Sequence, residues 1–149
     1  MTENIPDNTQ GKTTGSKLRY VTIVARTLMG LLFIMTGLNG FLNFLPKPST
    51  PLPEGATAFF GALMNTHYMF PLIMGTQLLV GLLLVSNSFV PLALALIAPI
   101  IVGIITFHIF LSPTGVGMAI FVLIAELYLA WAYRNAFRPM LVFHAKHSG

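Results

Sequence analysis

The amino-acid sequence predicts an all-α fold: an integral membrane four-helix bundle with a short interfacial helix between the first and second spans. Apolar and aromatic residues make up 55% of the 149 residues and charged residues only 8%, and the mean hydropathy is +0.79. A soluble domain carries about 25% charged residues. No Asp, Glu, Lys or Arg occurs from residue 55 to residue 125, far more than the roughly 20 residues of one crossing. This composition excludes an ordinary cytosolic enzyme, and it predicts no binding of nucleic acid despite the net charge of +4.

The first half of the chain divides into a tail, a span, a loop and a short helix. Residues 1–19 are polar and predict a solvated cytoplasmic tail. The first span covers about 20–45, where the chain is almost wholly apolar. Four prolines in 46–54 predict an extended loop, because proline cannot continue a helix. Residues 56–64 are amphipathic and too short to cross a bilayer, so we expect an interfacial or re-entrant helix there.

Turn signals divide the apolar run that follows. The second span covers about 69–85, with Pro71 in its first turn, where proline is tolerated. The polar turn at 86–88 separates it from the third span, about 90–111, and the turn at 112–115 precedes the fourth, about 116–134. The four-span membrane domain is thus expected over 20–142, and residues 143–149 form a second cytoplasmic tail.

The distribution of Lys and Arg predicts the orientation of the spans. An excess of Lys and Arg marks the cytoplasmic side of a membrane protein. Only Lys47 lies in a loop between spans, whereas six basic residues flank the two outer ends of the domain: Lys12, Lys17, Arg19, Arg134, Arg138 and Lys146. We therefore expect a multi-pass protein of the bacterial inner membrane with both termini in the cytoplasm.

Apart from Arg134 at the very end of the fourth span, Arg26 and Glu126 are the only Asp, Glu, Lys or Arg residues inside the predicted spans. At 1.5 Å per residue, Arg26 lies about 9 Å and Glu126 about 12 Å from the cytoplasmic edge. Arg26 shares a helix face with Gly30 and Gly37, and Glu126 shares one with Ala119, so both faces are expected to point inward. The matched depths predict an intramembrane ion pair. Such a pair either fixes the register of the bundle or forms a charged floor beneath a ligand or proton site.

A second polar group is expected nearer the outer edge. Asn39 and Asn43 lie one turn apart on the first span, Gln77 follows Pro71 by six residues, and His108 is close to the end of the third span. They predict a ligand pocket open to the outside, in which His108 is the most reactive group because an imidazole titrates near neutral pH. The alternative is hydrogen bonding between helices, which amides commonly make in lipid.

The sequence predicts no metal centre and no covalently bound or metal cofactor. The chain has no cysteine, which excludes disulfides and thiolate metal sites. His108 is the only histidine within a predicted span, whereas a b-type haem needs two axial ligands. Zinc sites, phosphate loops and nucleotide motifs are not evident.

Three segments of the sequence resemble the DoxX-like family of small four-span bacterial membrane proteins. They are RTLMGLLFIMTGLNGF (26–41), FHIFLSP (107–113) and LAWAYRNAFRP (129–139), and the likeness covers residues 20–142. Members are named for a subunit of a quinol or thiosulfate:quinone oxidoreductase. The resemblance implies an accessory protein or subunit of a quinone-linked oxidoreductase system that binds quinone or lipid, with the bilayer and a redox protein as partners.

Two departures from the family pattern bear on function. Many relatives carry a basic residue or histidine where this chain has Gly40, and a glutamate where it has Gln77. If that glutamate transfers protons in relatives, Gln77 cannot do so here. The alternative function is a stand-alone membrane enzyme or carrier for a small hydrophobic molecule that uses His108 and Glu126. The sequence alone leaves catalytic residues, enzymatic activity and oligomeric state open.

Overall fold

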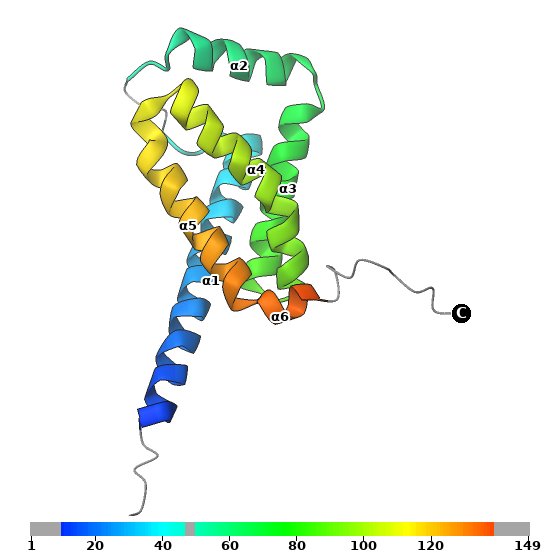
Figure 1. Cartoon of the computed structure of the whole chain (residues 1–149). Coiled ribbons are helices and arrows are strands. Elements are labelled where there is room, and N and C mark those ends of the chain that lie inside the picture. The colour runs from blue at the N-terminus through cyan, green and yellow to red at the C-terminus, as the bar shows by residue number, and fades with distance from the viewer. Residues whose placement is uncertain (1–9, 47–49, 139–149) are drawn as a thin grey trace, which may run out of the picture.

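Every regular element is a helix in the computed structural model, which describes residues 10–46 and 50–138. Figure 1 shows α1, α3, α4 and α5 running up and down beside one another, with α2 lying across one end. The predicted all-α class is therefore confirmed for the described residues. The elements are α1 (Gln10–Leu42), α2 (Glu54–Asn65), α3 (Met69–Val85), α4 (Val90–Phe110), the 3-10 helix η1 (Pro113–Gly115), α5 (Val116–Ala132) and α6 (Arg134–Phe137).

Three of the described stretches are long and apolar enough to cross a membrane: Gly15–Leu42, Val90–Phe110 and Pro113–Ala132. The helix α3 has only 17 residues and qualifies only together with α2, from which it is bent by 92°. The structure thus contains three such helices, or four if the bent pair is one span. The predicted second span coincides with α3, and the short helix expected at 56–64 lies within α2.

The helix α1 begins earlier than its composition suggests. Residues 10–19, assigned by their polarity to the cytoplasmic tail, are the first turns of α1. The physical reason is that no proline occurs between residues 10 and 42, and extending an existing helix costs less than nucleating a new one. Figure 1 shows this first part of α1 projecting beyond the other helices. The rest of the two expected tails lies outside the described residues.

The closest helix packing joins α1 to α3 through glycines. A Cβ atom at Gly37 would lie 2.7 Å from the backbone nitrogen of Leu78, and one at Gly81 would lie 2.7 Å from the carbonyl oxygen of Gly30. Such short distances mean that the two backbones touch, which only glycine allows. The small-residue face of α1 therefore points inward, as expected, but its partner is α3 and not the fourth span.

One apolar core lies among α1, α3, α4 and α5. Its members come from all four helices, and α1 packs closely against α3 and more loosely against α5. At the far end, α2 rests on α4 through the rings of Phe59, Phe60 and Phe107, whose centroids lie 5.1–6.0 Å apart. The largest fully buried side chains are those of Phe33, Val80, Leu84, Leu94, Ile97, Ile101 and Leu129.

Candidate functional site

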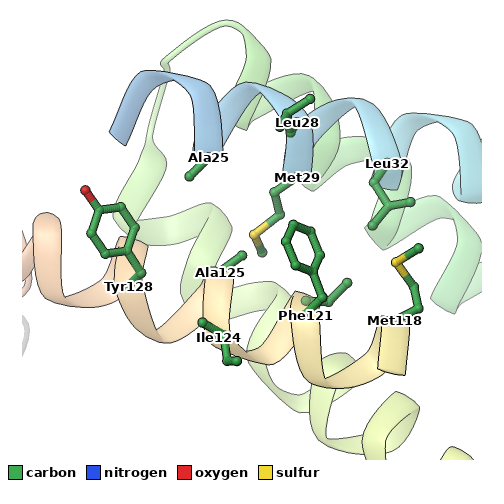
Figure 2. A pocket seen from close by; sticks show the side chains of 10 residues that line it. Ala25, Leu28, Met29, Leu32, Met118, Phe121, Ile124, Ala125 and Tyr128 are labelled. Atoms are coloured by element: carbon green, nitrogen blue, oxygen red, sulfur yellow. The ribbon is translucent and has the colours of Figure 1, made fainter. Parts of the chain in front are cut away.

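The loose contact between α1 and α5 leaves an apolar groove of about 380 Å³. The two helices run in opposite directions, so residues of α1 face residues of α5 along its length. Figure 2 shows Tyr128 at one end of the groove and Leu32 and Met118 at the other. The lining side chains are Ala25, Leu28, Met29, Leu32, Met118, Phe121, Val122, Ile124, Ala125 and Tyr128.

The groove has a single polar group, the hydroxyl of Tyr128. This hydroxyl lies 3.0 Å from the hydroxyl of Thr22 and shares a hydrogen bond with it. Thr22 also donates to the carbonyl oxygen of Leu18, at 2.9 Å. The groove is therefore apolar along its length and polar only at the end nearest the start of α1.

The groove opens sideways, away from the core. Leu28, Phe121 and Ile124 line it and yet are each more than half exposed. Around a helical bundle in a bilayer, such a surface faces lipid tails and not water. A hydrophobic molecule could therefore enter the groove laterally.

Arg26 and Glu126 are both buried, with exposed fractions of 8% and 6%. The Nη1 atom of Arg26 donates to the hydroxyl of Tyr133 at 3.4 Å, and that hydroxyl donates in turn to Asn87 at 3.5 Å. Arg26 Nε and Glu126 Oε2 are buried and have no hydrogen-bond partner among the described residues. No salt bridge of 4.0 Å or less joins the two side chains, so the expected ion pair is not formed in this structure.

The direction of the two helices explains why residues at matched depth do not meet. In an α-helix the side chains lean toward the N-terminus. The N-termini of α1 and α5 lie at opposite ends of the bundle (Figure 1), so Arg26 and Glu126 lean away from each other. Arg26 accordingly reaches Tyr133, which follows Glu126 by seven residues and caps the end of α5. The depth of a residue along its helix does not account for this lean of its side chain toward the N-terminus.

The four residues of the expected outer pocket are found separately. The Oδ1 atom of Asn39 accepts a hydrogen bond from the backbone N–H of Leu45 at 2.8 Å, at the end of α1. Asn43 is exposed and has a φ of 50°, a left-handed conformation that asparagine tolerates. Both residues thus serve the turn that ends α1.

Gln77 and His108 each have a partner of their own. The Oε1 atom of buried Gln77 accepts from the hydroxyl of Thr36 at 2.7 Å, a link between α3 and α1 in the middle of α3. The Nδ1 atom of His108 lies 3.0 Å from the carbonyl oxygen of Ser112. Within the described part of the chain no side-chain hydrogen bond joins any two of the four. The backbone N–H of Asn43 donates to the carbonyl oxygen of Asn39 at 2.8 Å, which belongs to the turn that ends α1. The outer pocket stays a prediction.

The groove is the feature that the sequence did not reveal. Ala25, Leu28, Met29 and Leu32 recur at helical spacing, but such a stripe is equally typical of an ordinary lipid-facing surface. Only the contact between α1 and α5 distinguishes this groove-lining stripe from an ordinary lipid-facing surface. For metals, no three His, Asp or Glu side chains gather among the described residues where they could share an ion.

Comparisons with family models, curated proteins and solved structures found no match to this chain. The resemblance to the DoxX-like family therefore rests on the three sequence segments alone.

Proposed function

We propose that the chain is an integral inner-membrane protein with four crossings, of the DoxX-like kind. In this proposal it is an accessory protein or subunit of a quinone-linked oxidoreductase system, and it binds quinone or lipid between α1 and α5. The observation that carries the proposal is the laterally open apolar groove with one hydroxyl at its end. Ligand sites of this kind are mostly apolar, with a few polar groups that fix orientation.

The distribution of charge supports the membrane orientation. The start of α1 and the end of α5 lie at the same end of the bundle (Figure 1), and Lys17, Arg19 and Arg134 belong to that end. Glu54 begins α2 at the opposite end. The guanidinium of Arg134 lies 4.6 Å from the ring centroid of Trp131, and such aromatic and basic residues are typical of a membrane interface.

The dimensions of the groove suit a ring with an apolar tail. Its residues extend over about two turns of α1, from Ala25 to Leu32, and about three turns of α5, from Met118 to Tyr128. Because the Thr22 hydroxyl donates its proton to Leu18, the Tyr128 hydroxyl donates to Thr22. To donate to a quinone carbonyl or to a lipid ester, Tyr128 exchanges this hydrogen bond for one to the ligand, while the methionine and leucine side chains contact the tail. Highly charged soluble substrates do not fit this lining.

Retention of a quinone by the purified protein tests the proposal. The full chain is placed in nanodiscs, and the binding of decylubiquinone is measured above that of empty nanodiscs. Ala125→Leu narrows the groove and should weaken binding at least tenfold, since a filled pocket cannot take the ring. Ala95→Leu is the matched control, because Ala95 is exposed on α4. Equal binding by both variants and the unmodified protein would place the ligand elsewhere.

A further inference from the structure

The polar end of the α1–α5 groove is connected to an aromatic and a basic side chain. Tyr128 ends the groove, and Trp131 and Arg134 follow it at intervals of three residues. The ring centroids of Tyr128 and Trp131 lie 6.3 Å apart, within the range of a ring contact. The guanidinium of Arg134 lies 4.6 Å from the ring centroid of Trp131. A continuous series of contacts therefore leads from the groove to a positive charge.

Arg134 has donors to spare for a ligand. Its Nη1 atom donates to the carbonyl oxygen of Trp131 at 3.0 Å, which is its one hydrogen bond among the described residues. A guanidinium carries five N–H donors. The side chain is exposed, and its contact with the Trp131 ring holds the guanidinium in place. A guanidinium held in this way suits a phosphate, whose oxygens can accept two parallel hydrogen bonds.

The two hydroxyls at the end of the groove do not compete for that role. Tyr128 donates to Thr22, and Thr22 donates to the carbonyl oxygen of Leu18, so the protons of both hydroxyls are already used. The unused donors that contacts connect to this end of the groove belong to Arg134. They favour an anionic group over a neutral carbonyl.

The charge of this end of the bundle also favours an anion. Four exposed basic residues belong to it: Lys17, Arg19, Arg134 and Arg138. Of the two carboxylates in the described part of the chain, Glu126 is buried and Glu54 begins α2 at the opposite end. Basic residues beside a membrane surface attract anionic lipids. A zwitterionic lipid carries a cation beside its phosphate, which the other basic residues of this end repel.

The groove has the direction and the length of a lipid tail in one leaflet. It runs along α1 and α5 (Figure 2), so in a bundle that crosses the membrane it is parallel to the acyl chains. The groove-lining part of α5, from Met118 to Tyr128, is about 15 Å long, half of a hydrocarbon core of about 30 Å. Apolar lining, hydroxyls, indole and guanidinium follow one another as tail, ester linkage and phosphate do in a phospholipid.

We propose that the α1–α5 groove binds an acyl chain of an anionic phospholipid of the cytoplasmic leaflet, and that Arg134 binds the phosphate of this lipid. The proposal rests on the groove of the proposed function and adds the class of lipid. A quinone has no anionic group, so it would leave the donors of Arg134 unused.

The fluorescence of Trp131 tests this assignment, because Trp131 is the only tryptophan in the chain. The full chain is placed in phosphatidylcholine vesicles, and lipids with brominated acyl chains, which quench the indole on contact, replace a rising fraction of the lipid. Brominated phosphatidylglycerol should reach half of its maximal quenching at a mole fraction at least about fivefold lower than brominated phosphatidylcholine. This is the effect of one cation close to an anionic lipid.

Variants locate the preference. Arg134→Gln should reduce the ratio of the two mole fractions to about one, whereas the matched control Arg138→Gln, which removes an exposed charge four residues away, should keep it. Arg134→Lys retains the charge without the two-donor fork, so its ratio should lie in between, and it serves if the glutamine variant does not fold. Ala125→Leu fills the groove and should also remove the preference, whereas Ala95→Leu should not.

Three results overturn the assignment. The first is equal quenching by the two brominated lipids in the unmodified protein. The second is an equal reduction of the ratio by Arg134→Gln and Arg138→Gln, which would show a diffuse attraction by the basic end. The third is a preference that survives Ala125→Leu, which would separate the phosphate from the groove.

The quinone assay distinguishes this failure from a failure of the proposed function. Any of the three results, combined with decylubiquinone retention that Ala125→Leu weakens and Ala95→Leu does not, removes the phospholipid and leaves the groove as a quinone site. Equal retention by these two variants and the unmodified protein would instead count against the proposed function.

Discussion

At the scale of single residues, the charges of Arg26 and Glu126 are expected to cost stability. Neither has a charged partner in the part of the chain that the structure describes, and an uncompensated buried charge is unfavourable. Arg26→Met and Glu126→Met should therefore leave the free energy of unfolding unchanged or raise it, measured on ligand-free protein in detergent. A direct ion pair would give the opposite result. Each single change would then cost about 3–5 kcal/mol, and the double variant would cost less than the sum.

His108, in α4, makes a hydrogen bond from which the effect of its substitution on stability can be predicted. His108 bonds to the carbonyl oxygen of Ser112, where the chain turns from α4 into η1, and a Cβ at Gly115 would collide with its ring. His108→Ala should lower stability by about 1 kcal/mol and leave ligand binding unchanged. Thermal melts and quinone retention on the same variant check both. Weaker retention with an unchanged melt would instead support the outer pocket of Asn39, Asn43, Gln77 and His108.

At the scale of helix pairs, the glycines between α1 and α3 give the sharpest expectation. A methyl group at Gly37 or Gly81 would press on backbone atoms of the other helix. Gly37→Ala and Gly81→Ala should each destabilise the protein by about 1–3 kcal/mol. Gly75→Ala and Gly103→Ala are matched controls with open space around them. These should be neutral or stabilising by up to about 1 kcal/mol, because alanine favours the helix.

An equal loss of stability in all four glycine variants would show that helix propensity, and not the close approach of α1 to α3, explains the effect. Denaturant or thermal unfolding followed by circular dichroism measures the four variants in one series. A lower free energy of unfolding for Gly37→Ala and Gly81→Ala than for Gly75→Ala and Gly103→Ala would support the close approach of α1 to α3.

The sequence predicted helices far better than it predicted contacts between them. Proline and polar turns fix the bounds of α3 and α4 within a residue or two because they act locally. The inward glycine face of α1 was also predictable from spacing. The helix that packs against this face was not predictable, because the spacing of glycines on one helix does not identify the helix that covers them. Arg26 and Glu126 illustrate the limit: their depths agree, but the opposite lean of their side chains depends on tertiary arrangement.

At the scale of the whole molecule, four crossings require that the two ends of the bundle lie on opposite sides of a membrane. The first turns of α1 and the turn between α3 and α4 belong to one end, and α2 and η1 belong to the other (Figure 1). The basic residues Lys17, Arg19 and Arg134 gather at the first end, which the charge bias assigns to the cytoplasm. The α1–α5 groove then opens into the bilayer.

Labelling of single cysteines measures this arrangement most directly, since the chain contains no cysteine of its own. The exposed residues Ser16, Ser88, Thr66 and Thr114 are each changed to cysteine and treated with a membrane-impermeant maleimide in intact bacterial cells. Cysteines at 66 and 114 should react in intact cells, and those at 16 and 88 only after permeabilisation. Reaction of 16 and 88 on different sides, or of all four in intact cells, would contradict a bundle that crosses the membrane four times.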